Sequence, residues 1–97
     1  MFPFNLIFVY NEVMNKRKLL QKILKGSRNV RFGDFVLLVE AFGFYSDRVK
    51  GSHHVFVHSE LKELVNLQNV KGQAKPYQVR QFLKLVEKYN LELEDEQ

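Results

Sequence analysis

Apolar residues recur at helical spacing in two stretches of the first half of the chain. In residues 16–25 they fall at i, i+1, i+4 and i+5, on one face of a helix: Leu19, Leu20, Ile23 and Leu24. Asn15 is suited to begin this helix and Gly26 to end it. Residues 33–42 predict a second helix, which Gly43 would stop. Its apolar face is bulky enough to lie against a sheet: Phe32, Phe35, Val36, Val39 and Phe42.

After residue 43 the apolar period shortens to two, which predicts strands. Residues 44–49 and 53–58 are two candidate strands joined by a turn at Gly51 and Ser52, and residues 64–68 are a third. The links between them are short, which favours an antiparallel meander, and residues 70–75 are predicted to form a loop. Pro76 suits the first position of a last helix over about residues 77–89. Its buried face has the spacing i, i+3, i+4, i+7: Val79, Phe82, Leu83 and Val86.

This order predicts an α+β domain in two layers, with helices on one face of a three-stranded antiparallel sheet and an extra helix in front. The other face of the sheet would be open to a ligand. A length of 97 residues, 45% hydrophobic and 27% charged, is typical of one soluble globular domain. The chain has no cysteine, which excludes disulfides and thiolate metal sites and fits a reducing cytoplasmic setting. The apolar opening MFPFNLIFVY falls short of the roughly twenty residues of a membrane span, so no membrane segment is expected.

Charge is distributed unevenly along the chain. Residues 14–31 hold seven basic residues and no acidic one: Lys16, Arg17, Lys18, Lys22, Lys25, Arg28 and Arg31. Residues 92–97 hold four acidic residues and no base. The sequence therefore divides into an N-terminal extension with a basic helix (1–28), a core domain (29–91) and an acidic tail (92–97). Such polarity indicates an anionic partner, nucleic acid before a membrane surface, although a solvated surface explains it too.

Three histidines lie in the second predicted strand. Because side chains alternate along a strand, His54 and His58 would share one face and His53 would take the other. Four residues of strand separate His54 from His58 by roughly 13 Å, too far for both to bind one ion. We therefore expect no metal and no other cofactor. For His53 and His58, packing or an amphipathic surface is the preferred interpretation.

The turn before these histidines suggests a phosphate site. Gly51 allows close approach of a backbone, and free N–H groups around Gly51 and Ser52 could bind an anion, with Lys50 adding a charge. His54 would then face the phosphate from the open sheet surface. Histidine titrates near neutral pH and suits proton transfer there. These groups suffice for metal-free RNA cleavage, because the base takes the 2′-OH proton and cations stabilise the charge that develops as this oxygen attacks phosphorus.

The stretch FVLLVEAFGFYSDRVKGSHHVFVH, followed by LVNLQ, a polar loop and YQVRQFLKLVEKYNL, resembles the HicA family of toxins. These are small mRNA interferases of bacterial and archaeal toxin–antitoxin pairs. The resemblance runs from about Val30 to Leu91, and its most specific element is G-S-x-H at residues 51–54. It implies a fold similar to that of double-stranded-RNA-binding domains. Residues 1–28 have no counterpart in the shortest members of the family.

The resemblance implies that His54 is the catalytic histidine and that Gly51 is the glycine before it. It also implies two partners, mRNA and a HicB-type antitoxin that shields this histidine. Lys75 and Arg80 are expected to hold phosphates together with Lys50, unless they form only a solvated loop and helix face. The alternative function is a non-catalytic RNA-binding module of the same fold. A third is a domain that binds only an antitoxin. The catalytic hypothesis fails if the His54 ring is buried among aliphatic side chains, or if it faces the helical layer with no cationic neighbours.

Overall fold

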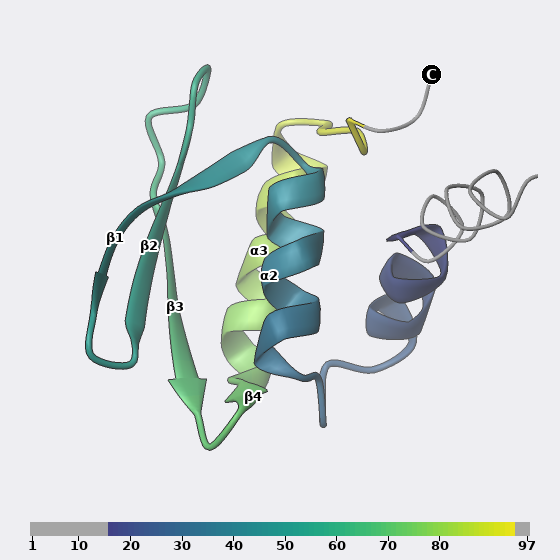
Figure 1. Cartoon of the computed structure of the whole chain (residues 1–97). Helices are drawn as coiled ribbons and strands as arrows, with labels where there is room; N and C mark the ends of the chain where they lie inside the picture. The colour runs from purple at the N-terminus through teal and green to yellow at the C-terminus, as the bar shows by residue number, and fades with distance from the viewer. Residues whose placement is uncertain (1–15, 95–97) are drawn as a thin grey trace, which may run out of the picture.

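The computed structural model describes residues 16–94, which form an α+β domain (Figure 1). A helix spans residues 16–25 and is called the N-terminal helix below. The elements after it are α2 (Phe32–Ala41), β1 (Phe44–Lys50), β2 (His53–His58), β3 (Val65–Val70), β4 (Gln73–Ala74) and α3 (Pro76–Lys88). The predicted fold class is therefore confirmed: a helix, an antiparallel sheet and a helix follow an extra N-terminal helix.

The predicted boundaries of α2 and α3, and the predicted end of the N-terminal helix, hold to within one residue. Helix α2 begins at Phe32 and ends at Ala41. The N–H of Gly43 then donates to the carbonyl of Glu40, and the φ of Gly43 is 95°, the left-handed conformation that a helix stop requires. Pro76 is the first residue of α3, where its missing N–H costs nothing. The predicted cap Asn15 lies outside the described residues.

The sheet has the order β1-β2-β3-β4, and all its neighbours are antiparallel. The predicted loop at residues 70–75 is wrong in part, because Gln73–Ala74 form a fourth strand that pairs with Asn69 and Val70. Lys71 (φ 52°) and Gly72 (φ 84°) are both left-handed, as the commonest two-residue hairpin turn requires. The side-chain oxygen of Asn69 accepts the N–H of Gly72 at 2.7 Å and holds this turn. Lysine is not a typical residue at such a position, and two residues are too few to show a period.

The hydrophobic core lies between the sheet and the helices, which cover one face of the sheet (Figure 1). The Phe82 ring of α3 lies at its centre, with its centroid 5.6 Å from those of Phe35 and Phe44 and 5.9 Å from that of Phe42. The N-terminal helix adds Ile23, which is 2% exposed. The N-terminal helix is thus packed onto the core. In residues 16–94, no helix has both the length and the apolar character to cross a membrane.

Candidate active site

The G-S-x-H motif forms the tip of the β1–β2 hairpin. Lys50 pairs with His53, so Gly51 and Ser52 make a two-residue turn, and Gly51 has a φ of 61°. Glycine with positive φ at the first turn position is typical of a type II′ hairpin turn. A Cβ built at Gly51 would meet no atom within 4 Å. The glycine therefore meets a conformational requirement of the turn, and this turn sets the register of the histidines that follow.

The register places His54 on the face of the sheet that the helices cover. His54 pairs with Leu67 of β3, which is 1% exposed, and Phe56, two residues along the same face, is 2% exposed. His58 lies on this face as well and His53 on the other, as predicted. The prediction that His54 lies on the open sheet surface is wrong. Phe56 must enter the core, and the period of two then turns His54 toward the helices.

The His54 ring is half-buried against the first residue of α2. Its centroid lies 4.7 Å from that of the Phe32 ring, with the planes inclined at 52°. In residues 16–94, the one buried side-chain nitrogen or oxygen that lacks a hydrogen bond belongs to Glu63, and no hydrogen bond there involves the His54 ring. Neither ring nitrogen of His54 is therefore both fully buried and unpaired. One flank of the imidazole is packed, and the side chain as a whole is half-exposed.

Two cationic residues are the sequence neighbours of elements near the contact between His54 and Phe32. Arg31 directly precedes Phe32, and its backbone forms an isolated β-bridge with Gln73 of β4. Lys75 directly follows Ala74, the second residue of that strand. The backbone of this region is tied together, because the N–H of Phe32 donates to the carbonyl of Gly72. The side chain of Arg31 is exposed. His54 thus faces the helical layer, and Arg31 and Lys75 are the candidates for the cationic neighbours that the catalytic hypothesis requires.

A bulge in β1 decides where Lys50 lies. The register shifts between Ser46 and Arg48, so that Asp47 is an extra residue on this strand. After it, Val49 lies opposite His54, whereas Lys50 lies opposite His53 and shares its face. Lys50 therefore projects from the outer face of the sheet, away from the face that carries His54.

The other predicted phosphate ligands lie on neighbouring elements. Lys75 precedes α3 and holds its ammonium 5.8 Å from the centroid of the Tyr77 ring. Arg80 of α3 is exposed and donates to the hydroxyl of Ser27 at 3.2 Å. Ser52 uses its carbonyl to accept the N–H of Asn69 at 2.9 Å. No pattern in the sequence predicts the Phe32–His54 and Ser27–Arg80 contacts, because the two partners of each contact lie far apart along the chain.

His58 is held in a different way from His54. Its Nδ1 accepts the N–H of Glu60 at 3.1 Å, and its ring packs edge-on against Phe44 with centroids 4.9 Å apart. One ring nitrogen is thus already engaged, and the four-residue spacing along β2 places the residue roughly 13 Å from His54. These contacts agree with a packing role for His58 and give it no part in chemistry at His54.

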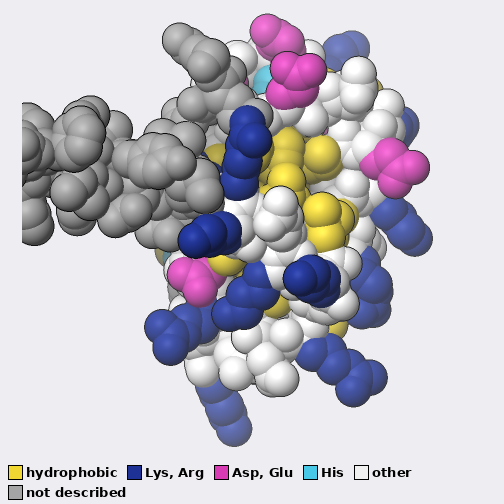
Figure 2. Space-filling view, turned by 90° about the vertical axis from the view of Figure 1, so that its right-hand side faces the viewer, with side chains coloured by type: hydrophobic (Ala, Val, Ile, Leu, Met, Phe, Trp, Pro, Cys, Tyr) yellow, Lys and Arg dark blue, Asp and Glu magenta, His cyan; other side chains and the backbone are white. Residues whose placement is uncertain are grey.

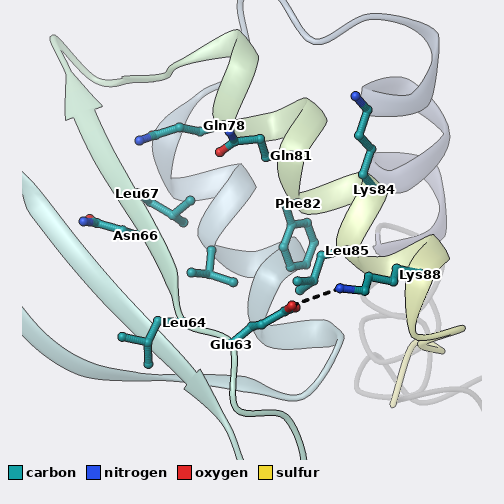
Figure 3. A pocket seen from close by; sticks show the side chains of 11 residues that line it. Glu63, Leu64, Asn66, Leu67, Gln78, Gln81, Phe82, Lys84, Leu85 and Lys88 are labelled. Carbon is teal, nitrogen blue, oxygen red and sulfur yellow. Dashed lines mark hydrogen bonds and ion pairs between the residues drawn. The ribbon is translucent and has the colours of Figure 1, made fainter.

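A groove of about 320 Å³ lies between β3 and α3 and holds none of the predicted site residues (Figure 3). Gln78 lies at one end, where its side-chain oxygen accepts the N–H of Gln68 at 2.9 Å. At the other end Lys88 donates to Glu63 at 3.2 Å, a hydrogen bond that raises the pKa of Lys88 above its ordinary value. The predicted residues therefore lie outside this groove: His54 lies on the inner face of the sheet, Lys50 on its outer face, and Arg80 on α3 beside Ser27.

Comparison with known proteins identifies the family. A family model described as the HicA toxin of bacterial toxin–antitoxin systems matches residues 32–87, which is more than half of the chain and runs from the first residue of α2 almost to the end of α3. The match includes the G-S-x-H hairpin and leaves the N-terminal helix outside. No curated protein and no solved structure matches the chain significantly. The chain belongs to the HicA toxin family of bacterial toxin–antitoxin systems.

Proposed function

We propose that this protein is a metal-independent endoribonuclease, an mRNA interferase, in which His54 transfers protons at the scissile phosphate. The observation that carries the proposal is the position of His54 in the family core. Its ring is half-buried and packed on one side by Phe32, the residue that directly follows the exposed Arg31. A general base must be held in a fixed position and must lie within reach of the proton that it takes. The contact with Phe32 supports the first condition, and the half-exposed side chain supports the second.

In this mechanism the neutral imidazole of His54 takes the proton of the ribose 2′-OH. The 2′ oxygen forms a bond to the adjacent phosphorus, and the bond from phosphorus to the 5′ oxygen breaks. Water protonates the leaving oxygen, because His53 lies on the opposite face and His58 is too distant. Arg31 and Lys75 stabilise the negative charge that develops on the phosphate oxygens. The 2′-OH requirement makes RNA the substrate and excludes DNA.

Two further roles belong to this proposal. Residues 29–91 are the RNA-cleaving unit, which encloses the matched range 32–87. A HicB-type antitoxin is the protein partner, and its binding would cover the end of the domain that carries His54. Lys50, Gly51 and Ser52 act from the hairpin tip: the glycine sets the turn, and the other two contact RNA from the outer side.

The test compares histidines on the two faces of one strand. His54→Ala, His53→Ala and the unchanged protein are incubated in EDTA with purified mRNA and a labelled RNA strand under single-turnover conditions, and RNA affinity is measured in parallel. We expect His54→Ala to lose roughly 100-fold or more of the cleavage rate, the usual contribution of a general acid or base, and to retain RNA binding. His53→Ala should cleave at nearly the original rate.

Other outcomes decide against the proposal. If the unchanged protein binds RNA but never cleaves it in EDTA, the protein is a non-catalytic RNA-binding module. If His54→Ala remains folded by circular dichroism and cleaves as fast as the unchanged protein, another residue is the base. If the protein binds no RNA even at low salt, where phosphate contacts are strongest, a domain that binds only an antitoxin is the better description.

A further inference from the structure

The N-terminal helix carries a stripe of lysines on the side away from the core. Ile23 is buried, and Leu19 and Leu20 pack against the core, which fixes how this helix is rotated. Three exposed lysines at i, i+4 and i+7 take the opposite side: Lys18, Lys22 and Lys25. At about 100° per residue they fall within a sector of roughly 60°. The stripe is therefore a defined surface with a fixed orientation on the domain.

Nothing within the described residues neutralises this stripe. No ion pair or hydrogen bond in residues 16–94 occupies Lys22 or Lys25, and no acidic residue occurs between positions 14 and 33. Like charges at i, i+4 repel each other and destabilise a helix. Figure 2 shows the face of the domain that carries this helix, and dark-blue Lys and Arg side chains gather over the lower half of that face. An anionic ligand along the stripe would relieve the repulsion.

The basic surface continues from this helix to the region around His54. Arg28 is exposed on the connecting loop, and Arg80 of α3 is tied to that loop by its hydrogen bond to Ser27. The loop then pairs with β4, where the carbonyl of Val30 accepts the N–H of Ala74, and it ends at the residue before Phe32. Cationic residues therefore occur at intervals along the chain from the N-terminal helix to Arg31, the residue before Phe32.

We propose that this surface is a second RNA-binding site, in which Lys22, Lys25 and Arg28 hold phosphates of the same RNA strand that reaches His54. It lies outside residues 32–87, so it adds to the family core and rests on the proposed ribonuclease function. The ligand is a polyanion of regularly spaced phosphates, read by charge and without base contacts. The surface increases affinity for RNA and leaves the chemical step to His54.

The test removes two charges from the surface and two from elsewhere. Lys22→Gln/Lys25→Gln is compared with Arg48→Gln/Lys62→Gln, which lowers the net charge equally but acts on β1 and the loop before β3. Glutamine keeps a good helix propensity. Each pair is made in the His54→Ala protein, and its affinity for a labelled mixed-sequence RNA strand is measured over a range of salt concentrations. Each pair is also made in the unchanged protein to obtain kcat and KM.

We expect Lys22→Gln/Lys25→Gln to weaken RNA binding about tenfold near physiological salt. The slope of log affinity against log salt should become shallower by about 1.4, which corresponds to two lost phosphate contacts on a single strand. KM should rise while kcat stays the same, and the control pair should change each quantity much less.

The two proposals can fail separately. Equal effects of the two pairs on affinity and slope would overturn the second RNA site, while cleavage that depends on His54 would still support the ribonuclease. Conversely, if the unchanged protein does not cleave RNA but Lys22→Gln/Lys25→Gln alone loses affinity, the second site stands and the ribonuclease proposal falls. A fall in kcat at constant KM for Lys22→Gln/Lys25→Gln would also overturn a binding-only role.

Discussion

The contact between Phe32 and His54 gives the sharpest test of how the fold prepares the site. Phe32→Leu keeps an apolar side chain of similar size where Phe32 is 7% exposed, but removes the ring that lies 4.7 Å from the imidazole. A volume-conserving core change costs less than about 1.5 kcal/mol, and an aromatic pair contributes about 0.5–1.5 kcal/mol. The expected loss of unfolding free energy is therefore about 0.5–3 kcal/mol, which a typical small domain survives.

The effect on cleavage should be larger than this stability loss explains. Without the phenyl ring, the imidazole of His54 gains freedom on its packed side, and a displacement of about 1 Å at a reacting group costs on the order of 100-fold in rate. We expect the single-turnover rate to fall about 10- to 100-fold at saturating RNA, with KM nearly unchanged. Urea denaturation provides the unfolding free energy, and cleavage is measured well below the denaturation midpoint.

Phe35→Leu is the matched control, because Phe35 lies on the same helix and is 0% exposed. Its ring packs edge-on against Phe82, so the same substitution also removes an aromatic pair from the core. Both variants should lose similar stability, but only Phe32→Leu should lose most of its cleavage. Equal rates for the two variants would refute the idea that Phe32 positions His54, and so would an unchanged rate in a folded Phe32→Leu protein.

Three further predictions concern the scaffold. Gly51→Ala should destabilise the protein by about 1–2 kcal/mol through its φ of 61°, whereas Gly26→Ala, with no positive φ, should have little effect in the same urea titration. Phe82→Ala should lower the free energy of unfolding by about 3–5 kcal/mol, and Phe82→Leu should lower it clearly less. A loss below this range for Phe82→Ala would contradict the central place of Phe82 in the core. Gln78→Leu should lower the free energy of unfolding by about 1–3 kcal/mol, because the N–H of Gln68 loses its acceptor. Hydrogen exchange at the Gln68 amide should become faster.

The sequence determined the helices and the first three strands of this protein because local rules define them. Helical spacing, the stop at Gly43 and Pro76 at the start of α3 are properties of neighbouring residues, and the structure confirms them. The opposite faces of His53 and His54 also follow from the two-residue period of a strand. Even the hairpin is local, since Gly51 and Ser52 make the turn themselves.

Tertiary structure decided which face of the sheet each residue of the site takes. A period of two separates His54 from His53 but does not say which of them faces the helices; the burial of Phe56 settles that question. The bulge at Asp47 moves Lys50 to the outer face, and no single-strand pattern reveals it. The ring that supports His54 comes from a helix packed across the sheet, a contact that exists only once the two layers have come together.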